Sequence, residues 1–197
     1  MKLLITGFGP FGNVKVNPSW EVAKRIALVH PAGVEVCARR LPVAFDGVGD
    51  VLWEAVEQFA PDVVLMLGVA TKRSVISYER VAINIDDSSN VDNDGKSYPG
   101  TPIRIDGPTA YFSTLPVKEM RDATLATGLA AEISNSAGTY VCNHTMYECL
   151  YRIEHNGLKT RAGFVHVPQL KTNGAIELDN MVKAITVAIE IIKKHED

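Results

Sequence analysis

Cys142 is the residue best placed to do covalent chemistry. It follows a turn through Gly138, at the point where a predicted helix begins that continues to about Asn156. The first turn of a helix has unpaired backbone N–H groups and a positive dipole end, so the thiol pKa is expected below its usual value of about 8.5. Cys37 and Cys149 lie in apolar surroundings and are expected to be core residues.

His166 is the candidate base for this thiol. It lies near the end of the apolar run 162–168, which is typical of a buried strand. Catalytic groups of α/β proteins gather at the carboxyl ends of such strands. His144 is the alternative. It lies only two residues from Cys142, however, so on a helix its side chain would point about 200° away. A cysteine with a histidine partner predicts acyl-transfer chemistry.

A catalytic imidazole usually has a third polar group that orients it. The acidic candidates are Glu79, Asp86, Asp87, Asp92 and Asp94. Glu79 is favoured because it immediately precedes the apolar run 81–84, which would anchor its carboxylate against the sheet. The alternative is an ion pair of Glu79 with Arg80 or Arg73, and spacing alone leaves both open.

The glycine-rich run 7–12 fits the G-x-G-x-x-G pattern of dinucleotide sites. In those sites the helix opens within the glycine run, whereas here Pro10 removes a donor and the helix is expected only from Pro18. The context therefore argues against a nucleotide. Phe8 and Phe11 are expected to form the wall of a small neutral pocket, the alternative being a tight turn with core aromatics.

Strand-like apolar runs alternate with amphipathic helical stretches along the chain. The predicted strands cover residues 2–6, 34–38, 63–67, 81–85, 130–134 and 163–167, and the predicted helices 18–28, 49–58, 117–126, 142–155 and 178–194. This alternation predicts an α/β fold, a three-layer α/β/α sandwich with a mostly parallel, mixed central sheet. The polar stretch 86–108 is expected to be a long loop.

Composition narrows the class of protein. The chain has 197 residues, 46% of them apolar, and no linker-like stretch, so a single catalytic domain over residues 1–197 is expected. A net charge of −3 without a basic cluster argues against nucleic acid as a partner. No run reaches membrane-spanning length and no signal segment is recognised, so we expect a cytoplasmic protein that does not bind membranes. Three cysteines at unrelated spacings predict neither disulfides nor a metal site.

Several motifs in one order resemble the pyroglutamyl peptidase I family, also called pyrrolidone-carboxylate peptidase. They are Thr6-Gly7-Phe8-Gly9-Pro10-Phe11-Gly12 with Asn17-Pro18-Ser19, Glu79-Arg80-Val81-Ala82-Ile83-Asn84, Ala110-Tyr111-Phe112-Ser113-Thr114-Leu115-Pro116, Ser134 to His144, and Gly163-Phe164-Val165-His166-Val167-Pro168. Together they cover nearly the whole chain.

The resemblance implies a cytosolic cysteine exopeptidase that removes an N-terminal pyroglutamyl residue from peptides through a thioester. It implies a Cys-His-Glu triad on Cys142, His166 and Glu79, no metal or organic cofactor, and assembly into homotetramers. The positions that match the family's substrate pocket are Phe8, Phe11, Tyr140 and Val141.

The chain departs from the family's pattern in three places. Lys72-Arg73 stands where the family has Gly-Arg, Ser89-Asn90 stands where it has a loop arginine, and Gln169 replaces an aromatic residue. Arg73 is expected to serve as oxyanion or site support. Two other functions remain open: a thiol amidase or amidotransferase of similar fold, and a ligand-binding module in which Cys142 is structural.

Overall fold

The computed structural model describes residues 1–170 and 177–195. The elements in chain order are β1 (Lys2–Phe8), α1 (Pro18–Val29), β2 (Glu35–Leu41), α2 (Phe45–Phe59), β3 (Val63–Ala70), β4 (Ile76–Glu79), β5 (Val81–Ile83), β6 (Asp86–Ser88), β7 (Tyr98–Thr101), β8 (Ala110–Phe112), α3 (Val117–Ala126), β9 (Ala131–Ser134), α4 (Val141–His155), β10 (Arg161–Pro168) and α5 (Leu178–Lys194).

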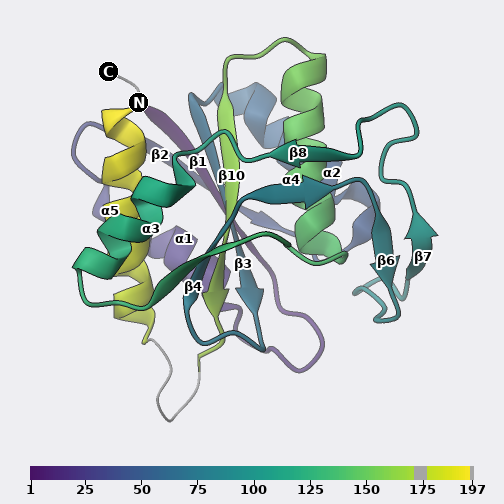
Figure 1. The fold of residues 1–197 in the computed structure, drawn as a ribbon, viewed down its shortest axis with the longest axis horizontal. Helices are drawn as coiled ribbons and strands as arrows, with labels where there is room; N and C mark the ends of the chain where they lie inside the picture. Colours follow the sequence, from purple (N-terminus) through teal and green to yellow (C-terminus); the bar gives the residue numbers. More distant parts are fainter. Residues whose placement is uncertain (171–176, 196–197) are drawn as a thin grey trace.

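Six of these strands form one central sheet in the order β2-β1-β3-β10-β4-β9. Strands β2, β1, β3 and β10 are parallel, β4 runs antiparallel to β10, and β9 is parallel to β4. Helices α1, α3 and α5 cover one face and helices α2 and α4 the other (Figure 1). The predicted three-layer α/β/α sandwich with a mixed, mostly parallel sheet is confirmed.

The layers follow from where the apolar residues stand. Residues 63–67 of β3 are all buried, as expected for a strand with helices on both faces. Helix α5 presents an apolar stripe to one side of the sheet, with Met181, Ile185 and Ile189 fully buried. None of the helices formed by the described residues is both long and apolar enough to cross a membrane.

Short strands are where the sequence prediction was wrong. Residues 76–79 form β4 inside the central sheet, which the sequence did not predict. The predicted strand 81–85 is the shorter β5, and it pairs with β8 in a separate two-stranded ribbon. The predicted loop 86–108 contains the hairpin β6–β7. Periodicity reveals strands of three or four residues poorly, although β9 (four residues) lies within the predicted strand 130–134.

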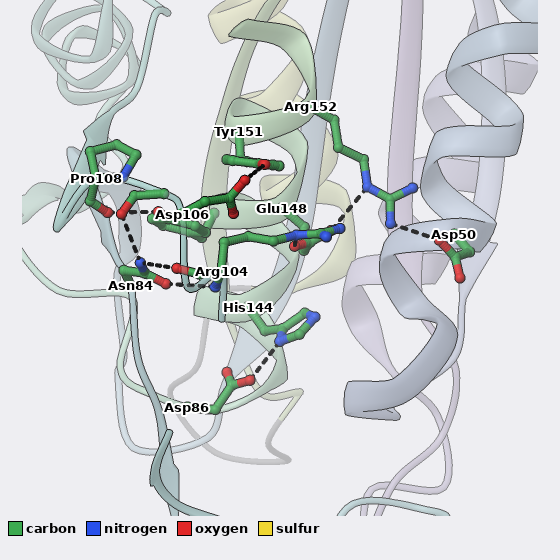
Figure 2. A network of polar contacts seen from close by, with 12 residues as sticks. Asp50, Asn84, Asp86, Arg104, Asp106, Pro108, His144, Glu148, Tyr151 and Arg152 are labelled. Atoms are coloured by element: carbon green, nitrogen blue, oxygen red, sulfur yellow. Dashed lines mark hydrogen bonds and ion pairs between the residues drawn. The ribbon is translucent and has the colours of Figure 1, made fainter. Parts of the chain in front are cut away.

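A network of charged side chains fixes helix α4 against its neighbours (Figure 2). Glu148 accepts from Nε of Arg104 at 2.5 Å and from Nε of Arg152 at 2.9 Å, and Arg152 Nη2 reaches Oδ1 of Asp50 on α2 at 2.6 Å. Although burial opposes its ionisation, these guanidiniums hold the pKa of Glu148 below its usual value. The network therefore orients the helix whose first turn carries Cys142.

Candidate active site

A cavity of about 830 Å³ opens where β1, β3 and β10 end. It is lined by residues from both helix layers and from the β6–β7 hairpin: Phe8, Phe11, Gly12, Asn17, Val43, Val69, Ala70, Thr71, Lys72, Arg73, Ser89, Asn90, Val91, Asp92, Asn93, Ala137, Gly138, Tyr140, Val141, Cys142 and His166. Every predicted site residue except Glu79 lies in this lining, and Glu79 contacts His166 from behind.

Glu79 and His166 form a buried pair. The side chain of Glu79 is fully buried at the end of β4, and its Oε1 lies 2.7 Å from Nδ1 of His166 on the adjacent antiparallel strand β10. Arg73 Nη1 donates to the same oxygen at 2.6 Å, and Arg73 Nη2 donates to the carbonyl of Ser136. The two functions left open for Glu79 therefore coexist, while Arg80 is exposed and takes no part.

This pairing fixes the tautomer of the imidazole. A carboxylate only accepts hydrogen bonds, so the Nδ1–H group of His166 donates a hydrogen bond to Glu79. In the neutral imidazole Nε2 is then an acceptor, free to take a proton from a group in the cavity. The hydrogen bonds found within residues 1–170 and 177–195 do not include one between His166 and the sulfur of Cys142. Catalytic contacts often tighten only when substrate binds.

Cys142 lies in the first turn of α4, as predicted. Tyr140, the N-cap residue, makes no side-chain capping bond, so the first N–H groups of the helix remain available as donors. The expected low thiol pKa is wrong. Burial raises the pKa of Cys142 to about 12, with the negative charge of Glu79 adding to the shift and Arg73 opposing it. The thiol is thus neutral at pH 7 before substrate binds.

Aromatic residues form part of the cavity wall. Phe8 ends β1 and its N–H donates to Oγ of Ser19 at 3.0 Å, which holds the start of α1 beside the strand end. A side chain at Gly7 would lie 2.6 Å from the backbone of Ser19, so only glycine allows this close approach. Phe11 and Tyr140 complete the wall. Helix α1 begins at Pro18, outside the glycine run, as predicted.

The β6–β7 hairpin supplies a wall that the sequence did not predict. Asp92 is buried and accepts from three backbone N–H groups, those of Phe45, Asp94 and Lys96, at 2.8 to 2.9 Å. Tyr140 Oη donates to the carbonyl of Val91 at 3.0 Å. The only sequence signal was the length of the polar stretch 86–108, because loops this long tend to be functional or mobile.

The remaining candidates lie elsewhere. His144 is not part of the cavity lining. It pairs through Nδ1 with Asp86 at 2.8 Å (Figure 2). Cys149 is buried, as expected, whereas Cys37 is partly exposed on β2 and is not a full core residue. His30, His155 and His195 are exposed at helix ends. Within the described part of the chain, no three His, Cys, Asp or Glu side chains are grouped so that they could hold a metal ion.

Comparison with known proteins identifies the class as a peptide hydrolase. Residues 1–195 match the pyroglutamyl peptidase family. Pyrrolidone-carboxylate peptidases from Streptococcus pyogenes serotype M3 and Bacillus licheniformis are 43% and 41% identical to the chain, covering 100% and 99% of it and 94% of each relative. The crystal structure of pyroglutamyl peptidase I from Bacillus amyloliquefaciens superposes with a TM-score of 0.95 at 36% identity, covering 100% of this chain and 98% of that one.

The chain therefore belongs to the pyroglutamyl peptidase family, and the resemblance inferred from its motifs is confirmed. This membership makes the protein a hydrolase, so the interpretation as a non-enzymatic ligand-binding module is wrong.

Proposed function

We propose that this protein is a cysteine exopeptidase that removes an N-terminal pyroglutamyl residue from peptides. The observation that carries the proposal is one cavity whose lining contains Cys142, His166 and the aromatic residues Phe8, Phe11 and Tyr140. Glu79 and Arg73 support the imidazole from behind. The cavity requires no metal or organic cofactor for this chemistry.

The first half of the reaction forms an acyl-enzyme. Sγ of Cys142 attacks the pyroglutamyl carbonyl carbon while its proton passes to Nε2 of His166. The imidazolium is stabilised by the carboxylate of Glu79, and it then protonates the leaving amine as the C–N bond breaks. Because the pKa of the Cys142 thiol is raised, the proton moves during the attack and not before it.

The second half hydrolyses the thioester. Water attacks the acyl carbon, His166 accepts its proton, and pyroglutamate leaves as the thiol is reprotonated. The uncapped N–H groups at the start of α4 are the proposed donors to the oxyanion. Arg73 is held by Glu79 and Ser136, which supports a positioning function more than direct contact with the oxyanion.

The substrate's lactam ring is small and neutral, with one N–H and one carbonyl. Phe8, Phe11, Tyr140 and Val141 are proposed to enclose it, because a pocket for such a group needs apolar walls and few charges. The cavity is large enough for a drug-sized ligand, so it has room for the peptide residues that follow the ring.

Hydrolysis of a pyroglutamyl chromogenic amide tests the proposal. Wild-type protein should release the chromophore, Cys142→Ala should not, and Cys149→Ala should retain most activity. One alkyl group on Cys142, located by mass spectrometry, should account for inactivation. Full activity of protein alkylated at Cys142 would show that Cys142 is not the nucleophile. Turnover of other small amides without pyroglutamyl cleavage would favour a thiol amidase or amidotransferase.

We further propose that residues 1–197 form one catalytic domain, that it acts in the cytoplasm, and that it assembles into a homotetramer as the family resemblance implies. One sheet drawing strands from residues 2–168 supports the single domain. Three free thiols suit a reducing compartment.

Phe112 and Ile105, which are 68% and 92% exposed, supply apolar surface for the proposed assembly. Light scattering after size-exclusion chromatography measures the mass in solution.

A further inference from the structure

Lys72 is held at the rim of the cavity by a tight turn. The N–H of Arg73 donates to the carbonyl of Ala70 at 3.1 Å, so Thr71 and Lys72 are the central residues of a four-residue turn directly after β3. The guanidinium of Arg73 is tied to Glu79 and to Ser136. Both ends of the turn are therefore fixed, and the exposed side chain of Lys72 stands in the cavity lining.

Lys72 is also a charged residue of that lining that has no ion-pair partner among the described residues. Arg73 is neutralised by Glu79, and both oxygens of Asp92 are occupied by backbone N–H groups. The ammonium group of Lys72 has no ion pair or hydrogen bond with any of residues 1–170 and 177–195. The lactam is neutral and offers this cation a carbonyl oxygen but no charge, so an ion-pair partner has to come from another part of the substrate.

The register of the sheet places Lys72 on the leaving-group side. Phe8 and Phe11 of the aromatic wall lie at the end of β1 and just after it. The turn with Lys72 follows β3, whose end pairs with the end of β10 through Val69 with Val167 and Ala70 with Pro168. His166 lies on that part of β10 and must lie beside the leaving amine to protonate it. The chain beyond the scissile amide therefore leaves toward Lys72.

We propose that Lys72 binds a carboxylate on the residue that directly follows pyroglutamate, and so gives the enzyme a preference for acidic leaving groups. This inference rests on the proposed function. Two sources of that carboxylate exist, an acidic side chain or the free α-carboxylate of a pyroglutamyl dipeptide. Either carboxylate would contact the same ammonium group. Because that group is exposed to solvent, the preference is modest and weakens with salt.

Four peptides separate charge from shape: pyroglutamyl-Glu-amide against its neutral isostere pyroglutamyl-Gln-amide, and pyroglutamyl-Ala against pyroglutamyl-Ala-amide. At low salt the wild type should favour the charged member of a pair in kcat/KM by roughly two- to fivefold, mainly through KM. A preference in the first pair identifies the side chain, and one in the second pair identifies the α-carboxylate. Lys72→Gln should bring the ratio to about one, and Lys72→Glu should reverse it.

Lys159→Gln is the matched control, because Lys159 is exposed just before β10 begins. It therefore lies at the amino-terminal end of the strand, whereas the cavity lies near the carboxyl end. This variant should keep the wild-type ratio. Ratios of one in the wild type, or ratios that Lys72→Gln leaves unchanged, overturn the inference while the hydrolysis of pyroglutamyl-Gln-amide still supports the proposed function. If the wild type cleaves none of the four peptides, the proposed function and the proposed role of Lys72 are both wrong.

Discussion

The absent side chain of Gly68 makes room for the sulfur of Cys142. A Cβ at position 68 would lie 3.0 Å from Sγ of Cys142 and 2.7 Å from the ring of Phe164. Gly68 is also the register partner of His166 on the neighbouring parallel strand. The buried strand β3 therefore has no side chain at the position that lies beside both the proposed nucleophile and the proposed base.

Gly68→Ala should lower kcat by roughly ten- to a hundredfold, because displacing a nucleophile by a fraction of an ångström spoils its alignment. Gly163→Ala is the control. Its Cβ would lie 2.4 Å from Oγ of Ser113, so it introduces a comparable clash outside the cavity. Both variants should have a lower Tm, but only Gly68→Ala should lose turnover. Equal kcat values in the two folded variants would reduce Gly68 to a packing residue.

Glu79→Gln should lower kcat by roughly ten- to a thousandfold with a smaller change in KM, since an amide cannot stabilise the imidazolium of His166 as a carboxylate does. Steady-state kinetics on a pyroglutamyl amide measures both constants. Glu132→Gln, the same change on an exposed residue of β9, should have little effect. A kcat near that of the wild type would leave Glu79 as a structural partner of Arg73.

Long elements were predictable and short ones were not. Helices α3 and α5 have the bounds that periodicity predicted, because 10 and 17 residues display an apolar stripe clearly. Strand β4 has only four residues, and its place between β10 and β9 depends on partners far away in the sequence. Glu79 was chosen correctly as a partner of His166, but for the wrong reason, since it ends β4 and does not merely precede β5.

The site was predictable in its residue types and not in its electrostatics. Position in the first helical turn led to the expectation of a low pKa for Cys142, but burial, with the charge of Glu79 adding to it, raises the pKa to about 12. The contacts of Asp92 with backbone N–H groups on another element could not be predicted either, because they depend on how the hairpin folds over the sheet.

The buried thiols should make the protein less stable at alkaline pH. Burial raises the pKa of both Cys142 and Cys149 to about 12, whereas an unfolded thiol has a pKa of about 8.5. Between these values the folded state holds protons that the unfolded state releases. The stabilisation is therefore complete below the unfolded pKa and is lost as pH rises toward 12. Urea unfolding at several pH values should show this loss, with a shallower slope in Cys149→Ala. Parallel slopes would contradict it.

Phe11→Ala tests the aromatic wall. Loss of ring packing against the lactam should lower kcat/KM by a factor equivalent to about 1–3 kcal/mol. Cys142 should remain alkylatable, because α4 positions it independently. Phe112→Ala removes an equal ring that is 68% exposed on β8 and lies outside the cavity lining, so its effect on hydrolysis should be small. Unchanged kinetics in folded Phe11→Ala would mean that the ring does not contact substrate.

Asp92→Asn should loosen the hairpin wall of the cavity. In the wild type one carboxylate oxygen accepts from the N–H of Phe45, and the other accepts from the N–H groups of Asp94 and Lys96. An asparagine must turn its NH2 group toward one of these donors, which leaves a buried polar group unpaired at a cost of about 1–3 kcal/mol. We expect a lower Tm and a KM raised severalfold, with kcat changed less because Cys142 and His166 keep their places. Asp94→Asn makes the same substitution two residues away on an exposed side chain and should change neither value. Thermal unfolding and initial rates measure both effects, and an Asp92→Asn protein with wild-type KM would show that this hairpin does not shape the substrate pocket.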